Sequence, residues 1–238
     1  MTRRPKIRAV CVVVPAHDEE ELVGRCLDGL AQAAGRAAAA GIDVRLTFAL
    51  DDCHDRTAEI VLARAMPVPL EVVETDARSV GVARALGTSA ALAATDAPLE
   101  AVWLAHTDAD SCVPPGWLVD QIALADRGAD VVVGTVRPDP ADLSAAQLGA
   151  WDRTRVPGRP NGHVHGANLG MRASAYVAAG GFAPEPLHED VHLAERLRTA
   201  PGVVIVASDV VDVLTSGRPV GRAPGGYARY LREDLAPA

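Results

Sequence analysis

The sequence of 238 residues contains no apolar run that approaches the roughly 20 residues of a membrane-spanning helix, and no signal-peptide core follows its first residues. This absence predicts a cytosolic protein and leaves peripheral contact with a membrane surface open. A formal net charge of −8 argues against a surface that binds nucleic acid. The four cysteines form no Cys-x-x-Cys pair, which favours buried thiols in a reducing compartment.

Glycine-rich phosphate-binding motifs are missing as well. The first predicted strand is followed by Pro15-Ala16-His17-Asp18, where a Rossmann dinucleotide site would carry Gly-x-Gly-x-x-Gly. No Gly-x-x-x-x-Gly-Lys segment occurs either, so a P-loop is excluded. A nucleotide would therefore have to be bound by another route.

Strand-like and helix-like segments alternate through the first half of the sequence. Strands are predicted at 7–14, 44–50, 70–74, 101–104 and 131–133, and helices at 18–40, from 55 or 57 onward, at 80–94 and at 117–127. The second half is less regular, with predicted helices at 143–152, 172–179, 189–198 and 227–231 and strands at 203–206 and 210–214. Without an internal repeat or a linker, the pattern predicts one α/β domain over 1–238, whose mostly parallel, Rossmann-like central sheet has helices on both faces.

The most informative segment is the apolar run that ends in Thr107-Asp108-Ala109-Asp110. A buried strand that stops at two aspartates brings both carboxylates to the edge of a sheet, where open α/β folds bind ligands. Carboxylate oxygens at this spacing suit Mg²⁺ or Mn²⁺ shared with a substrate phosphate. Asp108 and Asp110 are therefore candidate metal ligands.

Six segments have recognisable motifs, at 12–20, 51–57, 81–87, 107–110, 166–172 with 180–182, and 189–190. In their order and spacing, these segments resemble the family-2 glycosyltransferases, which have the GT-A fold. Each is common alone, but the six together are specific, and the resemblance runs from about residue 8 to about residue 200. It divides the domain into a nucleotide-sugar-binding half at about 7–135, an acceptor half at about 136–214 and a tail at 215–238.

The resemblance implies that a sugar moves from a UDP- or GDP-linked donor to an acceptor hydroxyl, with inversion at the anomeric carbon. Mn²⁺ or Mg²⁺ would be held by Asp108 and Asp110, with His192 as a candidate third ligand, and Asp190 would be the catalytic base. The donor nucleotide would be bound by Pro15, Ala16, His17, Glu19, Asp52, Arg84 and Asp108. The acceptor side would comprise Gly166, Ala167, Asn168 and Glu189.

Two other functions stay open. The segment 188–192 matches the His-Glu-x-x-His signature of zinc metallopeptidases, with His188 and His192 as ligands, although prolines just upstream place His188 at a helix start. The second alternative is a catalytically inactive module that binds a nucleotide sugar, and the intact acidic set argues against it.

Some residues have both a functional and an ordinary interpretation. Arg218 and Arg222 either clamp the diphosphate or belong to a solvated basic tail. His163 and His165 either contact the acceptor or phosphate or are exposed loop histidines. Asp55 is predicted to cap a helix rather than to bind a ligand.

Overall fold

A computed structural model describes residues 4–185, 187–221 and 226–235 of the chain. Its strands are β1 (Ala9–Ala16), β2 (Asp43–Asp51), β3 (Leu70–Thr75), β4 (Val102–His106), β5 (Ser111–Cys112), β6 (Val131–Pro138), β7 (Leu169–Arg172) and β8 (Ile205–Thr215). Its α-helices are α1 (Val23–Ala39), α2 (Thr57–Ala63), α3 (Val80–Ala93), α4 (Trp117–Asp126), α5 (Ala145–Arg153), α6 (Ala173–Ala178), α7 (Glu189–Thr199) and α8 (Tyr227–Arg229).

All of these strands join one sheet in the order β3-β2-β1-β4-β7-β6-β8-β5. The pairs among β3, β2, β1 and β4 are parallel, and so is the pair of β6 and β8. Strand β7 lies antiparallel between β4 and β6, and the short β5 is antiparallel to β8. The predicted α/β domain with a mostly parallel sheet is confirmed.

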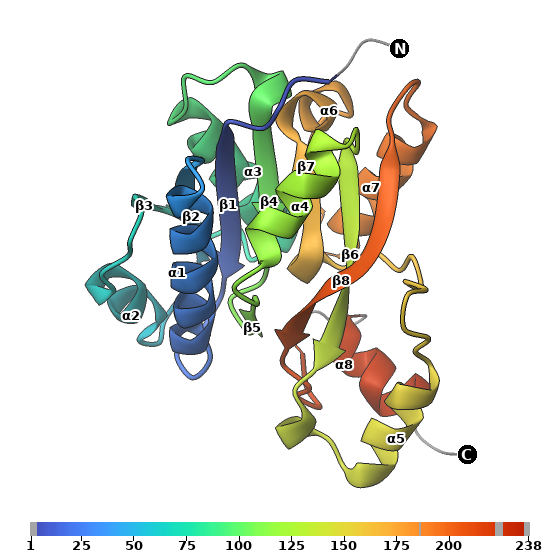
Figure 1. The fold of residues 1–238 in the computed structure, drawn as a ribbon. Helices are drawn as coiled ribbons and strands as arrows, with labels where there is room; N and C mark the ends of the chain where they lie inside the picture. Colours follow the sequence, from blue (N-terminus) through green and yellow to red (C-terminus); the bar gives the residue numbers. More distant parts are fainter. Residues whose placement is uncertain (1–3, 186, 222–225, 236–238) are drawn as a thin grey trace.

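Helices cover both faces of the sheet (Figure 1), because the side chains of the central strands point alternately to opposite sides. Val10, Val12 and Val14 of β1 pack in the hydrophobic cluster that contains α1 and α4. Cys11 and Val13 pack in the second cluster, on the side of α3, α6 and α7. The nearly continuous apolar run of β1 follows from this burial on both faces.

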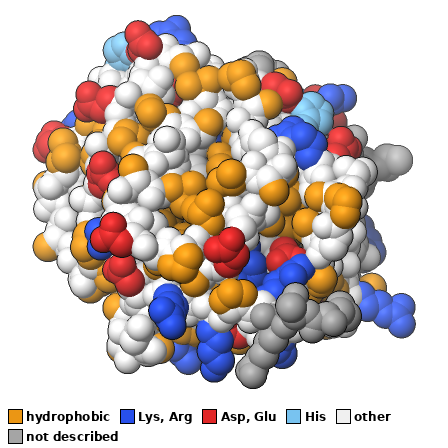
Figure 2. Space-filling model, turned by 90° about the horizontal axis from the view of Figure 1, so that it is seen from above, with side chains coloured by type: hydrophobic (Ala, Val, Ile, Leu, Met, Phe, Trp, Pro, Cys, Tyr) orange, Lys and Arg blue, Asp and Glu red, His pale blue; other side chains and the backbone are white. Residues whose placement is uncertain are grey.

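The parallel strands β1, β2 and β4 end at one edge of the sheet, and the polar loops that follow them lie there (Figure 1). The face at the opposite end, where these strands begin, is drawn in Figure 2. Hydrophobic side chains spread across the middle of this face, and charged side chains lie mainly around its rim. None of the helices in the described part of the chain is both long and apolar enough to cross a membrane.

Candidate active site

A cavity of about 1010 Å³ opens beside the ends of β1, β2 and β4. Its volume is at the upper end of the range for small-molecule sites, so it can hold more than one small ligand. It is lined by most of the predicted site residues: Pro15, Ala16, His17, Glu19, Arg84, Asp108, Asp110, Gly166, Ala167, Glu189 and Asp190. Asp52, Asn168 and His192 do not line it.

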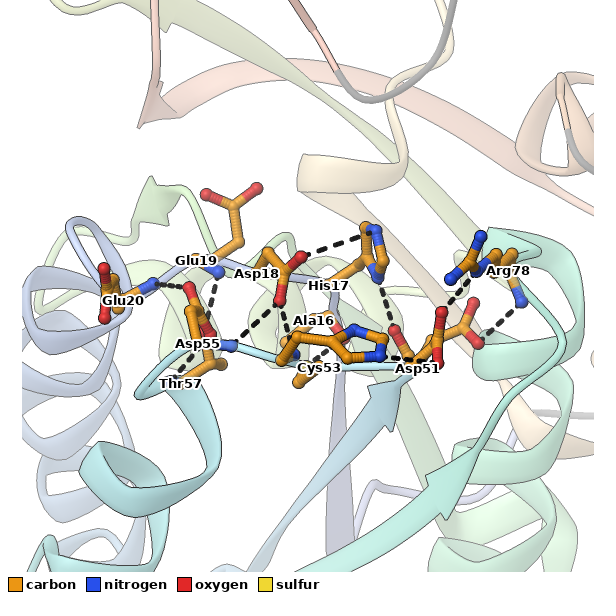
Figure 3. Close-up of polar contacts among 12 residues, drawn as sticks. Ala16, His17, Asp18, Glu19, Glu20, Asp51, Cys53, Asp55, Thr57 and Arg78 are labelled. Atoms are coloured by element: carbon orange, nitrogen blue, oxygen red, sulfur yellow. Dashed lines mark hydrogen bonds and ion pairs between the residues drawn. The ribbon is translucent and has the colours of Figure 1, made fainter.

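The loop after β1 and the last residue of β2 line one end of the cavity, and polar contacts join this loop to the one that follows β2 (Figure 3). His17 Nδ1 lies 2.6 Å from the carbonyl oxygen of Asp51. The buried Asp51 carboxylate accepts hydrogen bonds from the backbone N–H groups of Arg78, at 2.8 Å, and Ser79, at 2.7 Å. Asp52 follows with a positive φ of 52° and forms an ion pair with Arg78. The structure therefore brings Asp51, rather than the predicted Asp52, to the cavity wall.

The acids after β1 hold these two loops together. Asp18, at φ 48°, accepts hydrogen bonds from the backbone N–H groups of His54, at 2.7 Å, and Asp55, at 3.2 Å. Asp55 in turn accepts the N–H of Thr57 at the start of α2, at 2.9 Å, but it lies one residue before the N-cap position, which is Arg56, so its predicted place as the cap is off by one residue. Helix α1 begins only at Val23, so the prediction of a helix that starts at residue 18, with the acids at 18–21 in its first turn, is wrong.

Arg84 joins the ends of two elements that are far apart in the sequence. Its side chain is 2% exposed, its Nε donates a hydrogen bond to Glu189 at 2.9 Å, and its Nη2 pairs with Asp108. The remaining Nη1 is buried and has no hydrogen-bond partner among the described residues. Arg84 is thus a buried cation between the end of β4 and the start of α7, and not a surface arginine.

A second arginine neutralises the other predicted metal ligand. Arg218 donates hydrogen bonds to both carboxylate oxygens of Glu19, at 2.8 and 2.7 Å, and lies 3.0 Å from Asp110. Burial, together with the charge of Asp108, raises the pKa of Asp110 to about 7 even though the Arg218 charge opposes the shift. Arg222, the other tail arginine of interest, lies outside the described residues.

The two aspartates can supply only some of the ligands that a divalent cation needs. In the described ranges, no three His, Cys, Asp or Glu side chains are grouped so as to hold a metal ion. Asp108 and Asp110 supply hard oxygen ligands on the cavity wall, and they fit Mg²⁺ or Mn²⁺ whose other ligands come from a phosphate or water. His192 does not join them, because its ring pairs with Glu185 outside the cavity. The structure does not support it as the third ligand.

Asp190 faces the same cavity from the first turn of α7. Its Oδ2 accepts a hydrogen bond from the backbone N–H of Gly166 at 2.6 Å, and its Oδ1 accepts one from Val191 at 2.8 Å. These bonds fix the carboxylate against the glycine-rich segment 161–168. A carboxylate held in this way can accept a proton from a bound hydroxyl.

The His-Glu-x-x-His segment does not have the arrangement of a zinc peptidase. His188 lies before α7 in a left-handed conformation, at φ 62°, and its ring centroid is 6.4 Å from that of His192. Glu189, which would have to activate water, is buried and paired with Arg84. The metallopeptidase alternative therefore finds no support.

Asn168 is a structural residue, which corrects its prediction as part of the acceptor side. Its buried Oδ1 accepts hydrogen bonds from Trp117 at 2.8 Å and Gln121 at 3.4 Å. Its Nδ2 donates to the carbonyl oxygens of Thr135 at 2.8 Å and Val211 at 3.0 Å. The amide therefore links α4, β6 and β8, and its two donor hydrogens and its oxygen are already used in hydrogen bonds within the protein.

Sequence reasoning missed several residues on the wall. They include Asp51, Ser79, Thr135, Trp151, Thr215, Ser216, Tyr227 and Tyr230. Asp51 belongs to the same acidic loop as Asp52, and the sequence does not say which of two neighbours turns inward. Aromatic residues make up only 3% of the chain, so aromatic side chains in the less regular second half, such as Trp151, Tyr227 and Tyr230, stand out in the sequence as candidates for a binding surface.

Comparison with known proteins supports a family assignment. The family described as "Glycosyl transferase family 2" matches residues 11–176. Residues 1–349 of S. aureus TarS, solved in complex with UDP-GlcNAc, share the fold with a TM-score of 0.67 and 14% identity over 92% of this chain. The chain spans 61% of the length of that TarS fragment.

Two mycobacterial structures also share the fold. A structure described as a mycobacterial protein aligns over 94% of this chain and 72% of its own, with 19% identity and a TM-score of 0.59. M. tuberculosis glucosyl-3-phosphoglycerate synthase, in complex with Mn²⁺, UDP and glucosyl-3-phosphoglycerate, aligns over 86% of this chain and 71% of its own, with 19% identity and a TM-score of 0.51. Likeness at this level of identity establishes the GT-A architecture. No curated protein sequence matches the chain.

Proposed function

The chain belongs to glycosyl transferase family 2, and from this premise we propose that it transfers a sugar from a nucleotide diphosphate to an acceptor hydroxyl. The observation that carries the proposal is the placement of Asp108, Asp110 and Asp190 on the wall of one cavity. The complexes of TarS with UDP-GlcNAc and of the phosphoglycerate synthase with UDP favour a UDP-linked donor over a GDP-linked one.

In this proposal the donor nucleotide lies at the end formed by the loops after β1 and β2, within the half at about 7–135. Pro15, Ala16, His17 and Asp51 surround the base and ribose. Arg84, which lines the cavity and pairs with Asp108 and Glu189, would add positive charge beside the diphosphate.

Asp108 and Asp110 would hold Mn²⁺ or Mg²⁺ on the diphosphate. The metal supplies positive charge that stabilises the leaving group as the bond to the sugar breaks. The synthase complex that contains both Mn²⁺ and UDP supports this assignment.

Asp190 acts as the base on the acceptor side, at about 136–214. Its carboxylate takes the proton of the acceptor hydroxyl while that oxygen bonds to the anomeric carbon. The hydrogen bonds from Gly166 and Val191 keep the carboxylate in place for this step. A single displacement of this kind inverts the anomeric centre.

The four free cysteines fit a reducing compartment, and we assign the protein to the cytoplasm.

The test is a thermal-shift and calorimetric panel of UDP, GDP, dTDP and ADP, each with and without Mn²⁺. A ligand that binds only the folded state raises its apparent stability. We expect UDP to raise the melting temperature only with Mn²⁺, in the wild type and in Asp96→Asn, whose side chain is exposed and outside the cavity. The Asp110→Asn variant should lose the response.

Release of UDP from UDP-sugars by the wild type then tests the reaction itself. Absence of any nucleotide response in the wild type would overturn the proposal. Stabilisation by Zn²⁺ alone, lost in His188→Ala, would overturn it in favour of the peptidase.

A further inference from the structure

The few aromatic side chains of this protein are distributed unevenly. The chain has three tryptophans, three tyrosines and two phenylalanines. Five of them are buried in the two clusters that flank the sheet: Phe48, Trp103, Trp117, Tyr176 and Phe182. The other three, Trp151, Tyr227 and Tyr230, all line the cavity, at the end away from the β1 and β2 loops. We call these three side chains the aromatic wall.

The aromatic wall is built from two distant segments, α5 and residues 227–230. The rings of Tyr227 and Tyr230 stack with centroids 5.8 Å apart and planes 20° apart. Trp151 Nε1 donates a hydrogen bond to the Tyr227 hydroxyl at 3.0 Å, and the His165 ring meets the Tyr227 ring edge-on at 5.7 Å. Trp151 is buried, shares a hydrophobic cluster with Leu231 and has the Arg155 guanidinium over its ring, 4.9 Å from the centroid, so it supports the two tyrosines rather than offering a free face. Tyr227 and Tyr230 are only half-buried, so ring surface stays open to the cavity.

The charges around the aromatic wall are largely balanced. Arg155 donates two hydrogen bonds, at 2.6 and 2.9 Å, to Asp212, which neutralises it. Arg159 and Asp209 also line the cavity, and the Asp209 carboxylate accepts the backbone N–H of Gly158 at 2.7 Å. His165 adds no positive charge at neutral pH, because burial lowers its pKa to about 4. Among the described residues, this end therefore lacks the cluster of unpaired cations that a phosphorylated or carboxylated acceptor would need.

We propose that the aromatic wall binds the acceptor, and that the acceptor is a neutral sugar ring, free or in a glycoside. A pyranose has apolar C–H faces and a rim of hydroxyl groups, so a flat aromatic surface with polar groups at its edge is complementary to it. Thr154, Asn161, His163 and Asp209 supply those polar groups on the same wall. The inference rests on the proposed transfer reaction and names the substrate class of its acceptor side.

The reaction is then a glycoside-forming substitution. The oxygen of one sugar hydroxyl bonds to the donor's anomeric carbon, and the bond from that carbon to the diphosphate oxygen breaks. The electron pair of the broken bond leaves with the nucleoside diphosphate, and the hydroxyl proton goes to Asp190. No oxidant or reductant is required.

The test compares neutral and anionic probes on the protein saturated with UDP and Mg²⁺. Methyl glycosides of glucose, mannose, galactose and N-acetylglucosamine are the neutral probes, and 3-phosphoglycerate is the anionic one. Saturation-transfer NMR should give signals from the ring protons of at least one glycoside and none from phosphoglycerate. Binding of phosphoglycerate but of no glycoside would overturn the inference.

Two substitutions of Tyr230 separate stacking from bulk. Tyr230→Phe keeps the aromatic plane and should bind the glycoside like the wild type, whereas Tyr230→Leu should bind it about three- to tenfold more weakly. Calorimetry with UDP should give the same affinity in all three proteins, which also shows that they fold. An unchanged glycoside affinity in Tyr230→Leu would overturn the inference. If the wild type binds UDP but no glycoside, only the inference fails; if it binds no nucleotide, the proposed function fails first.

Discussion

The Arg218 guanidinium lies 3.0 Å from the carboxylate of Asp110. The same guanidinium holds both oxygens of Glu19, and the Arg218 and Asp110 side chains are 24% and 15% exposed. A residue of the C-terminal segment therefore already supplies positive charge at a carboxylate that we assign to the metal. Any divalent cation that binds Asp110 has to compete with Arg218.

Replacement of Arg218 by alanine should therefore strengthen the binding of Mn²⁺ to the nucleotide-free protein. With its counter-ion removed, the group of Glu19, Asp108 and Asp110 presents more negative charge to the ion. We expect an affinity about three- to tenfold higher, measured by isothermal titration calorimetry. Arg64→Ala is the control, because it changes the net charge equally at an exposed ion pair with Asp28. Equal Mn²⁺ affinities in the two variants would show that Arg218 does not compete.

The Asp190→Asn variant should retain donor binding and lose transfer. Asparagine preserves the shape and can accept one of the two backbone N–H groups that bind the carboxylate, that of Gly166 or that of Val191, but it cannot take the proton of a hydroxyl. The rate of sugar transfer should fall about 10²- to 10⁴-fold, with little change in UDP affinity. Glu195→Gln, an exposed change on the same helix, is the control. Normal turnover by the asparagine variant would remove Asp190 from the base role.

The local pattern of apolar residues predicts most of the helices and strands, whereas β7 and β8, which were not predicted correctly, depend on pairing between distant parts of the chain. The apolar runs of β1 and β2 can be recognised as strands from the sequence, because strands buried on both faces need no alternation of apolar and polar residues. Strand β7 is only four residues long and runs directly into α6, and its partners β4 and β6 come from distant parts of the chain. Two strands were predicted where β8 is continuous, because polar residues interrupt it at the register shift opposite Gly134 and Val136.

The same division holds for the candidate site. Residues that end parallel strands, such as Asp108 and Asp110, can be placed from the sequence because strand ends share an edge. The choice between Asp51 and Asp52 depends on one left-handed backbone conformation, which composition does not specify. Asn168, in a glycine-punctuated segment, looks like a ligand-binding residue, but its partners lie on three other elements.

Asn168→Ala should destabilise the protein without touching the cavity wall. The substitution leaves the buried indole N–H of Trp117 and the carbonyl oxygens of Thr135 and Val211 without their partner. Each such loss is costly in a buried site, and we expect the free energy of unfolding to fall by roughly 2–4 kcal/mol in urea denaturation. Asn161→Ala, at an exposed loop position, should change it by less than about 0.5 kcal/mol. Similar values for the two variants would contradict the structural role of Asn168.

His165 should make the stability of the protein depend on pH in the acid range. Burial lowers its pKa in the folded protein from 6.5 to about 4, although the Asp190 charge opposes the shift. Between these two values the unfolded chain binds a proton that the folded protein does not. The free energy of unfolding therefore falls as the pH decreases through this window, by less than about 1.4 kcal/mol per pH unit, the limit for one proton.

The His165→Gln variant isolates this contribution, because glutamine does not titrate. Urea denaturation of the wild type and the variant at intervals from pH 7.5 to pH 4.5 gives two curves of stability against pH. The wild type should lose stability faster than the variant below about pH 6.5, since only the wild type carries the uncompensated proton uptake of the unfolded chain. Parallel curves for the wild type and His165→Gln would mean that the folded protein admits a proton to His165, and the balance of charge along the aromatic wall would have to be revised.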